Sequence, residues 1–348
     1  MKALVYGGPG QKSWTDKPDP AIEKPTDAIV RMTHTTICGT DLHILKGDVP
    51  ACVPGRVLGH EGVGVVEQTG SAVRNFRKGD HVLISCITSC GSCSYCKRQM
   101  YAHCADGGWI LGHTIDGTQA EYARIPHADN SLYPIQPGAD EEALVMLSDI
   151  LPTGFEIGVL NGQVRPGDIV AIVGAGPVGM AALLTAQFYS PARLIVVDLD
   201  PNRLEVAKKF GATDTICASG EEAVQQIKAM TPGGAGVDVA IEAVGLPATF
   251  NICQNILAPG AHLANVGVHG KSVDLHMENL WIQNVTITTG LVNTNTTPML
   301  LKTMQSGKID PARLITHRLP LDQIEEAYRL FTNATKEKSL TLKVILSA

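Results

Sequence analysis

A stretch near the middle of the chain constrains the fold more than any other. Residues 168–173, Asp-Ile-Val-Ala-Ile-Val, form the continuous apolar run typical of a buried strand, and 174–179, Gly-Ala-Gly-Pro-Val-Gly, follow at once. An apolar helix is predicted from Val178 to Tyr189. Strand, GxGxxG loop and helix in this order predict a dinucleotide-binding loop in a βαβ unit. A structural turn that binds no phosphate is the alternative.

Each glycine of this loop has a distinct expected role. Gly174 permits the tight turn, Gly176 lets a pyrophosphate approach the backbone, and Gly179 lets the helix pack on the strand. The helix start at Pro177 and Val178 offers free N–H groups and the positive end of the helix dipole to the phosphates.

The choice between cofactors depends on the next predicted strand, 193–198. Asp198 ends it, where a carboxylate accepts the ribose hydroxyls of the adenosine half and repels a 2′-phosphate. We therefore expect NAD rather than NADP. Arg203 is a nearby cation that can accommodate phosphate, so some use of NADP stays open.

Strand and helix patterns keep alternating after the loop. A helix is predicted at 201–210 and strands at 237–242 and 262–267, which favours an α/β domain with a doubly wound parallel sheet. Before the loop, short strand signals without long helical patterns predict a β-rich domain. These signals lie at 1–6, 28–33, 62–67 and 81–85.

The length of 348 residues favours two domains. We expect residues 1–152 and 293–348 to form the β-rich domain, closed by a final strand at 342–346, and residues 153–292 to form the dinucleotide-binding domain.

Charge and hydropathy exclude several function classes. The 28 basic and 34 acidic residues leave a net charge of -6, which disfavours binding to nucleic acid. No run of 18 apolar residues is present, so no membrane span is expected. The start of the chain lacks the apolar core of a signal peptide, and we expect a cytoplasmic protein with a small-molecule substrate.

Nine cysteines are present, and five of them crowd between Cys86 and Cys104. Four of these five have the spacing C-x2-C-x2-C-x7-C, which predicts a closed, tetrahedral and therefore structural zinc site. An iron–sulfur cluster or a nucleic-acid-binding zinc knuckle is the alternative. The expected ligands are Cys90, Cys93, Cys96 and Cys104.

A second set of metal-ligand types is scattered over the first half of the chain. Cys38, His60 and Asp149 would supply a thiolate, an imidazole and a carboxylate and leave a position open for substrate. Glu61 is a further candidate, as a ligand that exchanges with water or substrate. We expect these residues to hold a catalytic zinc ion, the second of two per chain.

Over nearly its whole length the chain resembles the zinc-dependent medium-chain alcohol dehydrogenase family. The resemblance is carried by Cys38-Gly39-Thr40-Asp41, by 59–64 (Gly-His-Glu-Gly-Val-Gly), by the four-cysteine loop, by the GxGxxG sequence and by Asp198. It implies a GroES-like domain that holds both zinc sites and a Rossmann domain that binds the cofactor.

The resemblance also implies roles for single residues. Thr40 matches the hydroxyl that contacts the reacting alcohol and takes its proton, and His43 matches the histidine that relays the proton outward. Asp41 matches the carboxylate that orients His60. Other matched or expected positions of the cofactor site are Thr153, Val244, Val266, Val268, Leu291 and Val292.

One departure from the family pattern concerns Asp149, which stands where many members have a cysteine ligand. It resembles a branch that includes bacterial secondary-alcohol dehydrogenases, a branch that often lacks the four cysteines and often prefers NADP. An apolar substrate pocket is expected, although core packing explains Trp109 equally well. It would be lined by Trp109, Ile110 and Leu111 and closed from the other side by Pro298, Leu291 and Val292.

These features predict an NAD-dependent alcohol dehydrogenase or aldehyde reductase for small aliphatic or aromatic substrates. A polyol, threonine or formaldehyde dehydrogenase on the same scaffold is the alternative, and a catalytically idle relative is disfavoured because both ligand sets are complete. Relatives imply a homo-oligomer, a tetramer or dimer, through the edge of the Rossmann sheet near Leu291.

Overall fold

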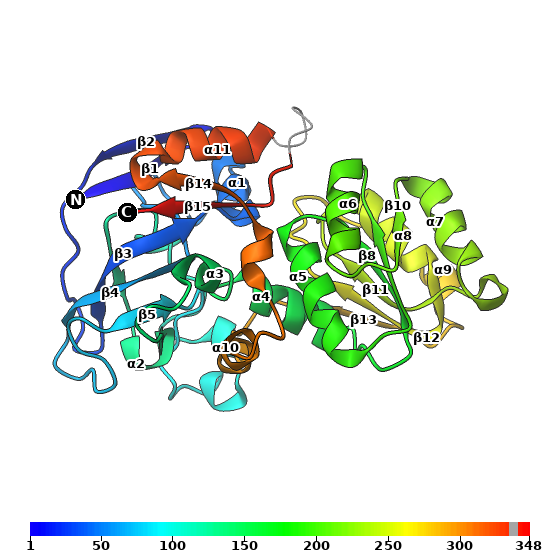
Figure 1. The fold of residues 1–348 in the computed structure, drawn as a ribbon, viewed down its shortest axis with the longest axis horizontal. Coiled ribbons are helices and arrows are strands. Elements are labelled where there is room, and N and C mark those ends of the chain that lie inside the picture. The colour runs from blue at the N-terminus through cyan, green and yellow to red at the C-terminus, as the bar shows by residue number, and fades with distance from the viewer. Residues whose placement is uncertain (334–339) are drawn as a thin grey trace. The chain divides into compact units, whose positions relative to one another are not determined.

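The structure is a computed structural model that describes residues 1–333 and 340–348. The chain divides into two compact units (Figure 1). Among the described residues, the first unit contains 1–149, 293–333 and 341–348, and the second contains 150–292 and 340.

The first boundary lies three residues earlier than the sequence suggested. Residues 150–152 belong to the second unit because α4 (Ile150–Thr153) packs against α5 (Pro177–Ala186). Residues 334–339, part of the tail that we expected to return to the first domain, lie outside the described residues.

The first unit is built on a seven-stranded sheet in the order β14-β15-β3-β4-β5-β7, with β6 paired to β3. All its pairs are antiparallel except β14 with β15. β1 and β2 form a separate hairpin. The strands are β1 Lys2–Gly8, β2 Gln11–Asp16, β3 Ala28–Thr36, β4 Gly62–Thr69, β5 His81–Ile84, β6 Tyr122–Ile125, β7 Leu132–Pro134, β14 Ile315–Pro320 and β15 Lys343–Ser347.

Apolar side chains alternate along β3, so that one row packs into the core. Val30 and Met32 lie there with Ile84 and Leu111. The helices of this unit are short, apart from α11, and lie between the strands. They are α1 Gly39–Lys46, η1 Cys96–Arg98, η2 Tyr101–His103, α2 Ala128–Ser131, α3 Glu141–Val145, α10 Thr297–Gln305, η6 Pro311–Leu314, η7 Leu321–Gln323 and α11 Ile324–Asn333.

The second unit contains a six-stranded parallel sheet in the order β10-β9-β8-β11-β12-β13. The chain therefore runs outward in one direction from β8 and then in the other from β11, which is the strand order of a Rossmann fold. The strands are β8 Ile169–Val173, β9 Arg193–Val197, β10 Asp214–Ile216, β11 Val237–Glu242, β12 Leu257–Asn265 and β13 Thr286–Thr289.

Helices connect these strands over both faces of the sheet. They are α4, η3 Gly154–Leu160, α5, η4 Gln187–Tyr189, α6 Pro201–Lys209, α7 Gly220–Ala229, η5 Pro232–Gly234, α8 Pro247–Asn255 and α9 Met277–Leu280. The predicted fold class, a β-rich domain with a doubly wound parallel sheet, is confirmed. The helix predicted from Val178 to Tyr189 ends as an α-helix at Ala186 and continues as η4.

Candidate metal centres and cofactor loop

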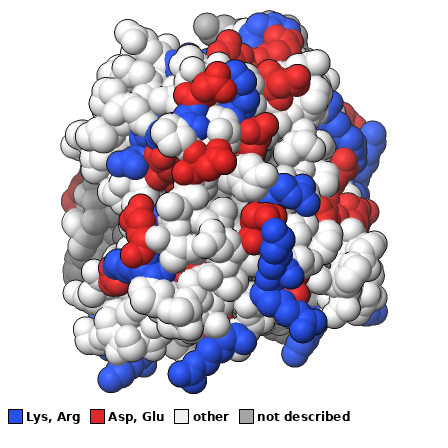
Figure 2. Space-filling view, turned by 90° about the vertical axis from the view of Figure 1, so that its left-hand side faces the viewer, with Lys and Arg blue, Asp and Glu red and all other residues white. Residues whose placement is uncertain are grey.

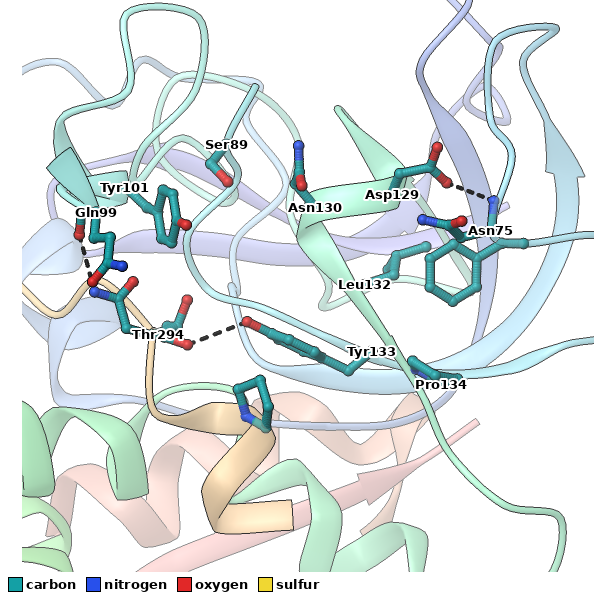
Figure 3. A pocket seen from close by; sticks show the side chains of 13 residues that line it. Asn75, Ser89, Gln99, Tyr101, Asp129, Asn130, Leu132, Tyr133, Pro134 and Thr294 are labelled. Atoms are coloured by element: carbon teal, nitrogen blue, oxygen red, sulfur yellow. Dashed lines mark hydrogen bonds between the residues drawn. The ribbon is translucent and has the colours of Figure 1, made fainter. Parts of the chain in front are cut away.

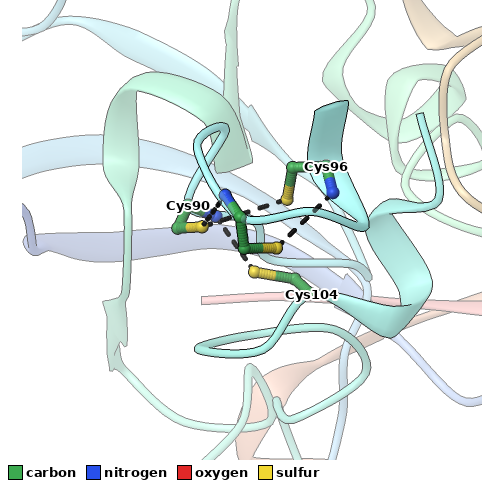
Figure 4. A group of neighbouring side chains, drawn as sticks. Cys90, Cys96 and Cys104 are labelled. Atoms are coloured by element: carbon green, nitrogen blue, oxygen red, sulfur yellow. Dashed lines mark hydrogen bonds between the residues drawn. The ribbon is translucent and has the colours of Figure 1, made fainter. Parts of the chain in front are cut away.

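The four cysteines of the C-x2-C-x2-C-x7-C sequence converge in the loop between β5 and β6 (Figure 4). Their sulfur atoms all lie within 4.8 Å of one another, and Cys90 Sγ is 4.0 Å from Cys96 Sγ. Backbone N–H groups donate to the sulfurs: Cys93 N to Cys90 Sγ at 3.4 Å, and Cys90 N to Cys104 Sγ at 3.2 Å.

These N–H donors favour the thiolate form of two of the sulfurs. N–H groups of Ala105 and Cys96 lower the pKa of Cys93 to about 6. Burial works to raise the pKa of Cys90, but hydrogen bonds from Ser92 and Cys93 lower it to about 7. Burial raises the pKa of Cys96 to about 12. Four converging sulfurs, two of which belong to thiols with a lowered pKa, fit a closed tetrahedral zinc site.

The scattered candidates also converge. One ligand atom from each of Cys38, His60, Glu61 and Asp149 lies within 4.8 Å of the others. Asp149 Oδ2 is 3.3 Å from His60 Nε2 and 3.6 Å from Cys38 Sγ. The first three residues are buried and Asp149 is half-buried, so one edge of the group is accessible.

Local structure presents Cys38 to this site. Cys38 caps α1, and a capping box joins it to Asp41, whose Oδ2 accepts the Cys38 N–H at 2.9 Å. Gln119 Nε2 donates to the same oxygen at 3.0 Å. Asp41 Oδ1 faces His60 Nδ1 at 3.7 Å, and among the described residues neither atom has a hydrogen-bond partner. Asp41 therefore lies close to His60, as expected, but does not form a hydrogen bond with it.

The carboxylate of Glu61 forms an ion pair with Lys343, a partner that the sequence did not predict. Lys343 Nζ donates to both carboxylate oxygens at 2.8 Å and to the carbonyl of Ile37 at 3.1 Å. Lys343 lies on β15, completely buried, so this ion pair is desolvated. Ligation of a metal by Glu61 stays a prediction, and it would compete with the ion pair to Lys343.

Burial and hydrogen bonding shift the pKa values of three of these candidate ligands. Burial raises the pKa of the Cys38 thiol. Burial lowers the pKa of His60, but hydrogen bonds with Asp149 and Cys38 outweigh it and hold this pKa well above its usual value. Burial raises the pKa of Glu61 to about 6 against the opposing charge of Lys343. A divalent cation coordinated by sulfur, nitrogen and oxygen would stabilise the deprotonated forms, so these residues fit zinc.

The two expected proton-transfer residues lie on α1. Thr40 Oγ1 is 3.6 Å from Cys38 Sγ, next to the candidate metal ligands. His43 is one turn further along the helix, is 24% exposed at its side chain, and faces Asp48 Oδ2 through Nδ1 at 2.9 Å. The spacing puts Thr40 and His43 on the same face of α1.

Trp109, the aromatic residue expected near the substrate, lies against His60, one of the candidate metal ligands. The Trp109 ring meets the edge of His60 with 6.3 Å between centroids and stacks on His113 at 4.2 Å. Leu111 instead fills the core beneath β3 and β5, since it is completely buried.

Pro298 lines a cavity of the first unit (Figure 3). This cavity has a volume of about 530 Å³, and Tyr133 on its wall donates to the carbonyl of Thr294 at 3.2 Å. None of the candidate metal ligands lines it. Polar and apolar side chains share its lining, with Tyr101, Asn130 and Leu132 among them.

The cofactor loop in the second unit has the expected geometry. Gly174 has φ +109°, and a Cβ on it would lie 2.5 Å from Val244. A Cβ on Gly179 would lie 1.9 Å from the carbonyl oxygen of Gly174, so only glycine lets α5 pack here. A Cβ on Gly176 would meet no atom within 4 Å, which leaves open space beside the backbone where helix α5 begins. That space fits the close approach of a phosphate.

Asp198 lies at the end of β9, and its carboxylate braces the loop. Oδ2 accepts the Ala175 N–H at 2.7 Å, and Oδ1 accepts the Asp200 N–H at 2.9 Å. Arg203 faces Asp200, with Nε 3.8 Å from Oδ2, rather than Asp198.

The remaining cofactor candidates all lie in the second unit, and most follow the carboxyl ends of parallel strands, the edge where such sheets bind ligands. Val244 follows β11, Val266 and Val268 follow β12, and Leu291 and Val292 follow β13. Val244 and Val268 are 40% and 53% exposed, whereas Val292 is buried. Thr153 ends α4.

Figure 2 shows one face on which basic and acidic side chains are interspersed in the upper part, while basic side chains gather toward the lower edge. Ion pairs account for several of the lysines of the first unit, such as Lys17 with Asp116 at 2.6 Å and Lys24 with Asp106 at 2.7 Å. In residues 1–333 and 340–348, no helix has the length and apolar character needed to cross a membrane.

Two family models match large parts of the chain. Residues 24–137 match the alcohol dehydrogenase GroES-like domain, and residues 177–306 match the zinc-binding dehydrogenase domain. An alcohol dehydrogenase of Cupriavidus necator is 38% identical over 96% of this chain and 95% of its own length.

Solved structures are similar over the whole chain. The zinc dependent alcohol dehydrogenase 2 from Streptococcus pneumonia, in its apo form, has a TM-score of 0.95 and 58% identity, with 100% of this chain and 98% of that chain covered. An alcohol dehydrogenase from Escherichia coli CFT073, complexed with NADH, has a TM-score of 0.88 and 26% identity, with 100% and 99% covered.

Proposed function

Because the chain belongs to the zinc-dependent medium-chain alcohol dehydrogenase family, we propose that it is an NAD-dependent enzyme that interconverts a small aliphatic or aromatic alcohol and the corresponding aldehyde or ketone. The observation that carries the proposal is the convergence of Cys38 Sγ, His60 Nε2 and Asp149 Oδ2 from segments far apart in the chain. Three ligands of these types leave a coordination position for substrate.

The proposal includes two zinc ions with different tasks. Cys38, His60 and Asp149 would hold the catalytic ion, which supplies the Lewis acidity that lowers the pKa of the substrate alcohol. The four-cysteine loop would hold the second ion in a closed site.

The chain's own residues then manage the proton. Thr40, whose hydroxyl lies beside Cys38, accepts the alcohol proton, and His43, one turn along α1, passes it toward solvent. Asp48 fixes the ring of His43 through Nδ1 and leaves Nε2 for the relay. Trp109 covers one side of His60 and limits the access of water there.

For the cofactor, we propose NAD bound along the carboxyl edge of the parallel sheet. Gly174, Gly176 and Gly179 shape the loop for the pyrophosphate, and the negative charge of Asp198 opposes a 2′-phosphate. Arg203 is engaged with Asp200, which supports the preference for NAD.

We also propose that the protein forms a homo-oligomer through β13. This strand is at the edge of the parallel sheet, and the apolar residues Trp281 and Ile282 just before it are 70% and 67% exposed. An open edge beside exposed apolar side chains favours pairing with a second copy. Analytical ultracentrifugation of the wild type and of Ile282→Glu tests this, and a monomeric wild type would contradict it.

The central experiment is a screen of NADH oxidation with small and aromatic aldehydes and ketones, run alongside metal analysis. We expect turnover with part of this panel and two zinc ions per chain. Full turnover after metal removal, or activity limited to NADPH, would overturn the corresponding part of the proposal.

A further inference from the structure

Cys86 lies two residues beyond β5 and is only 2% exposed, yet it belongs to neither of the two ligand groups found among the described residues. Its sulfur is 3.6 Å from Asp149 Oδ1, in hydrogen-bonding geometry with the thiol as donor. The mechanism outlined above does not use this residue.

The two oxygens of Asp149 have different surroundings. Oδ2 faces Cys38 Sγ and His60 Nε2, at 3.6 and 3.3 Å, which places it toward the candidate metal position. Oδ1 faces Cys86. We propose that Cys86 is a positioning residue whose S–H engages Asp149 Oδ1, so that Asp149 binds the metal through Oδ2 alone.

A backbone hydrogen bond holds Cys86 near Asp149. The N–H of Cys86 donates to the carbonyl of Ser148 at 3.1 Å, so residue 86 is fastened to the backbone just before Asp149 as well as to its side chain. Ser148 Oγ in turn accepts the N–H of Gly62 at 3.0 Å and contacts its carbonyl at 3.2 Å. The segments carrying His60, Cys86 and Asp149 are thereby tied into one unit.

The chemical reason lies in the difference between a carboxylate and a thiolate. A thiolate offers one ligand atom, whereas a carboxylate offers two and can chelate a cation with both. A buried donor on one oxygen removes that choice and keeps the coordination number low enough for substrate to bind. The inference rests on the proposed catalytic metal site and adds a residue that supports it.

The test uses the enzyme with cobalt(II) at the catalytic site alone and zinc kept in the four-cysteine loop, whose thiolates would otherwise dominate the absorption. The zinc affinity of the catalytic site is measured alongside by chelator competition. In Cys86→Ala we expect the cobalt d–d bands to change and zinc binding at the catalytic site to weaken about ten- to hundredfold. Cys86→Ser, which keeps a donor, is expected to restore both toward wild type. Cys52→Ala, which removes another buried thiol of the same unit (3.9 Å from the Gly112 carbonyl), is the matched control and should change neither.

The outcomes separate the two proposals. If Cys38→Ser leaves the cobalt–thiolate absorption unchanged, the proposed metal site is wrong and the inference falls with it. If that absorption is lost in Cys38→Ser but Cys86→Ala matches wild type in spectrum and affinity, only the role of Cys86 is wrong. A large loss of thiolate-to-cobalt intensity in Cys86→Ala would mean that Cys86 itself coordinates the metal, which also overturns a positioning role.

Discussion

The two groups of candidate zinc ligands are built by opposite routes. Cys90 and Cys104 are 14 positions apart in one loop, whereas Cys38 and Asp149 are 111 positions apart and meet only in the folded sheet. The loop sulfurs are surrounded by N–H groups of their own segment. The dispersed ligands depend on contacts from other segments, including Lys343 and Cys86. A local site of this kind suits a structural brace, and a dispersed site with an accessible edge suits chemistry.

The largest expected effect tests the site formed by Cys38, His60 and Asp149, which we propose to be catalytic. Cys38→Ser or His60→Ala should reduce kcat to below about a thousandth of wild type, because the Lewis acid is lost or misplaced. NADH binding, measured by fluorescence titration, should persist because the cofactor loop lies in the other unit. Cys52→Ser is the control. Substantial turnover in Cys38→Ser would remove the distinction between the two groups.

The second prediction concerns the four-cysteine loop, which we propose to be a structural zinc site. Cys93→Ser should lower the metal content by one ion per chain and reduce Tm by roughly 10 °C, because metal binding energy is folding energy in such loops. The exposed Cys217→Ser serves as control. An unchanged melting curve in a variant that has lost a zinc ion would show that the loop does not brace the fold.

A smaller effect is expected in the second unit, where the cofactor loop is also a local motif. Asp198→Ala should reduce the preference for NADH over NADPH about ten- to hundredfold, since the charge that repels a 2′-phosphate is removed. Asp238→Asn is the control, because its carboxylate accepts the Ile169 N–H at the opposite end of the strands. Tighter binding of NADPH than of NADH by the wild type would contradict the assignment.

The smallest effect tests the hydrogen bonds of Glu141, which precedes the candidate metal ligand Asp149 in the chain. Glu141, on the helix shortly before Asp149, bonds His34 Nδ1 at 3.2 Å and His81 Nδ1 at 2.7 Å, and the bond with His34 is the main cause that lowers its pKa to about 2. A lowered folded pKa contributes stability above the ordinary value near 4.5 and loses it as pH falls toward 2. Glu141→Gln should therefore cost about 1–2 kcal/mol at neutral pH and flatten the acid limb of the stability curve.

The neighbouring Glu142→Gln provides the control for this measurement. Glu142 bonds the exposed Arg318 and should contribute little. An equal loss of stability in both variants, or an unchanged acid limb in Glu141→Gln, would show that Glu141 has no special role.

Local motifs were the part of the molecule open to prediction. The GxGxxG loop between strand and helix, the four-cysteine spacing and the alternation that builds the parallel sheet all depend on short-range backbone geometry, and the fold class followed from them. Among the dispersed ligands, Asp149 was placed through the family resemblance, because a single residue of a common ligand type has no local pattern that marks it as a ligand. The substrate pocket expected around Pro298 stays a prediction, because the cavity that this residue lines includes none of the candidate metal ligands.

The sequence by itself determined the presence of a dinucleotide loop and of a four-sulfur site, because residues a few positions apart can meet only in a few ways. The tertiary structure alone decided what surrounds the dispersed group. The register of β15 between β14 and β3 places Lys343 on Glu61, and the hydrogen bond from Cys86 to Ser148 brings a thiol to Asp149. The first contact joins residues 282 positions apart and the second joins residues 63 positions apart, and no local pattern encodes pairings over such separations.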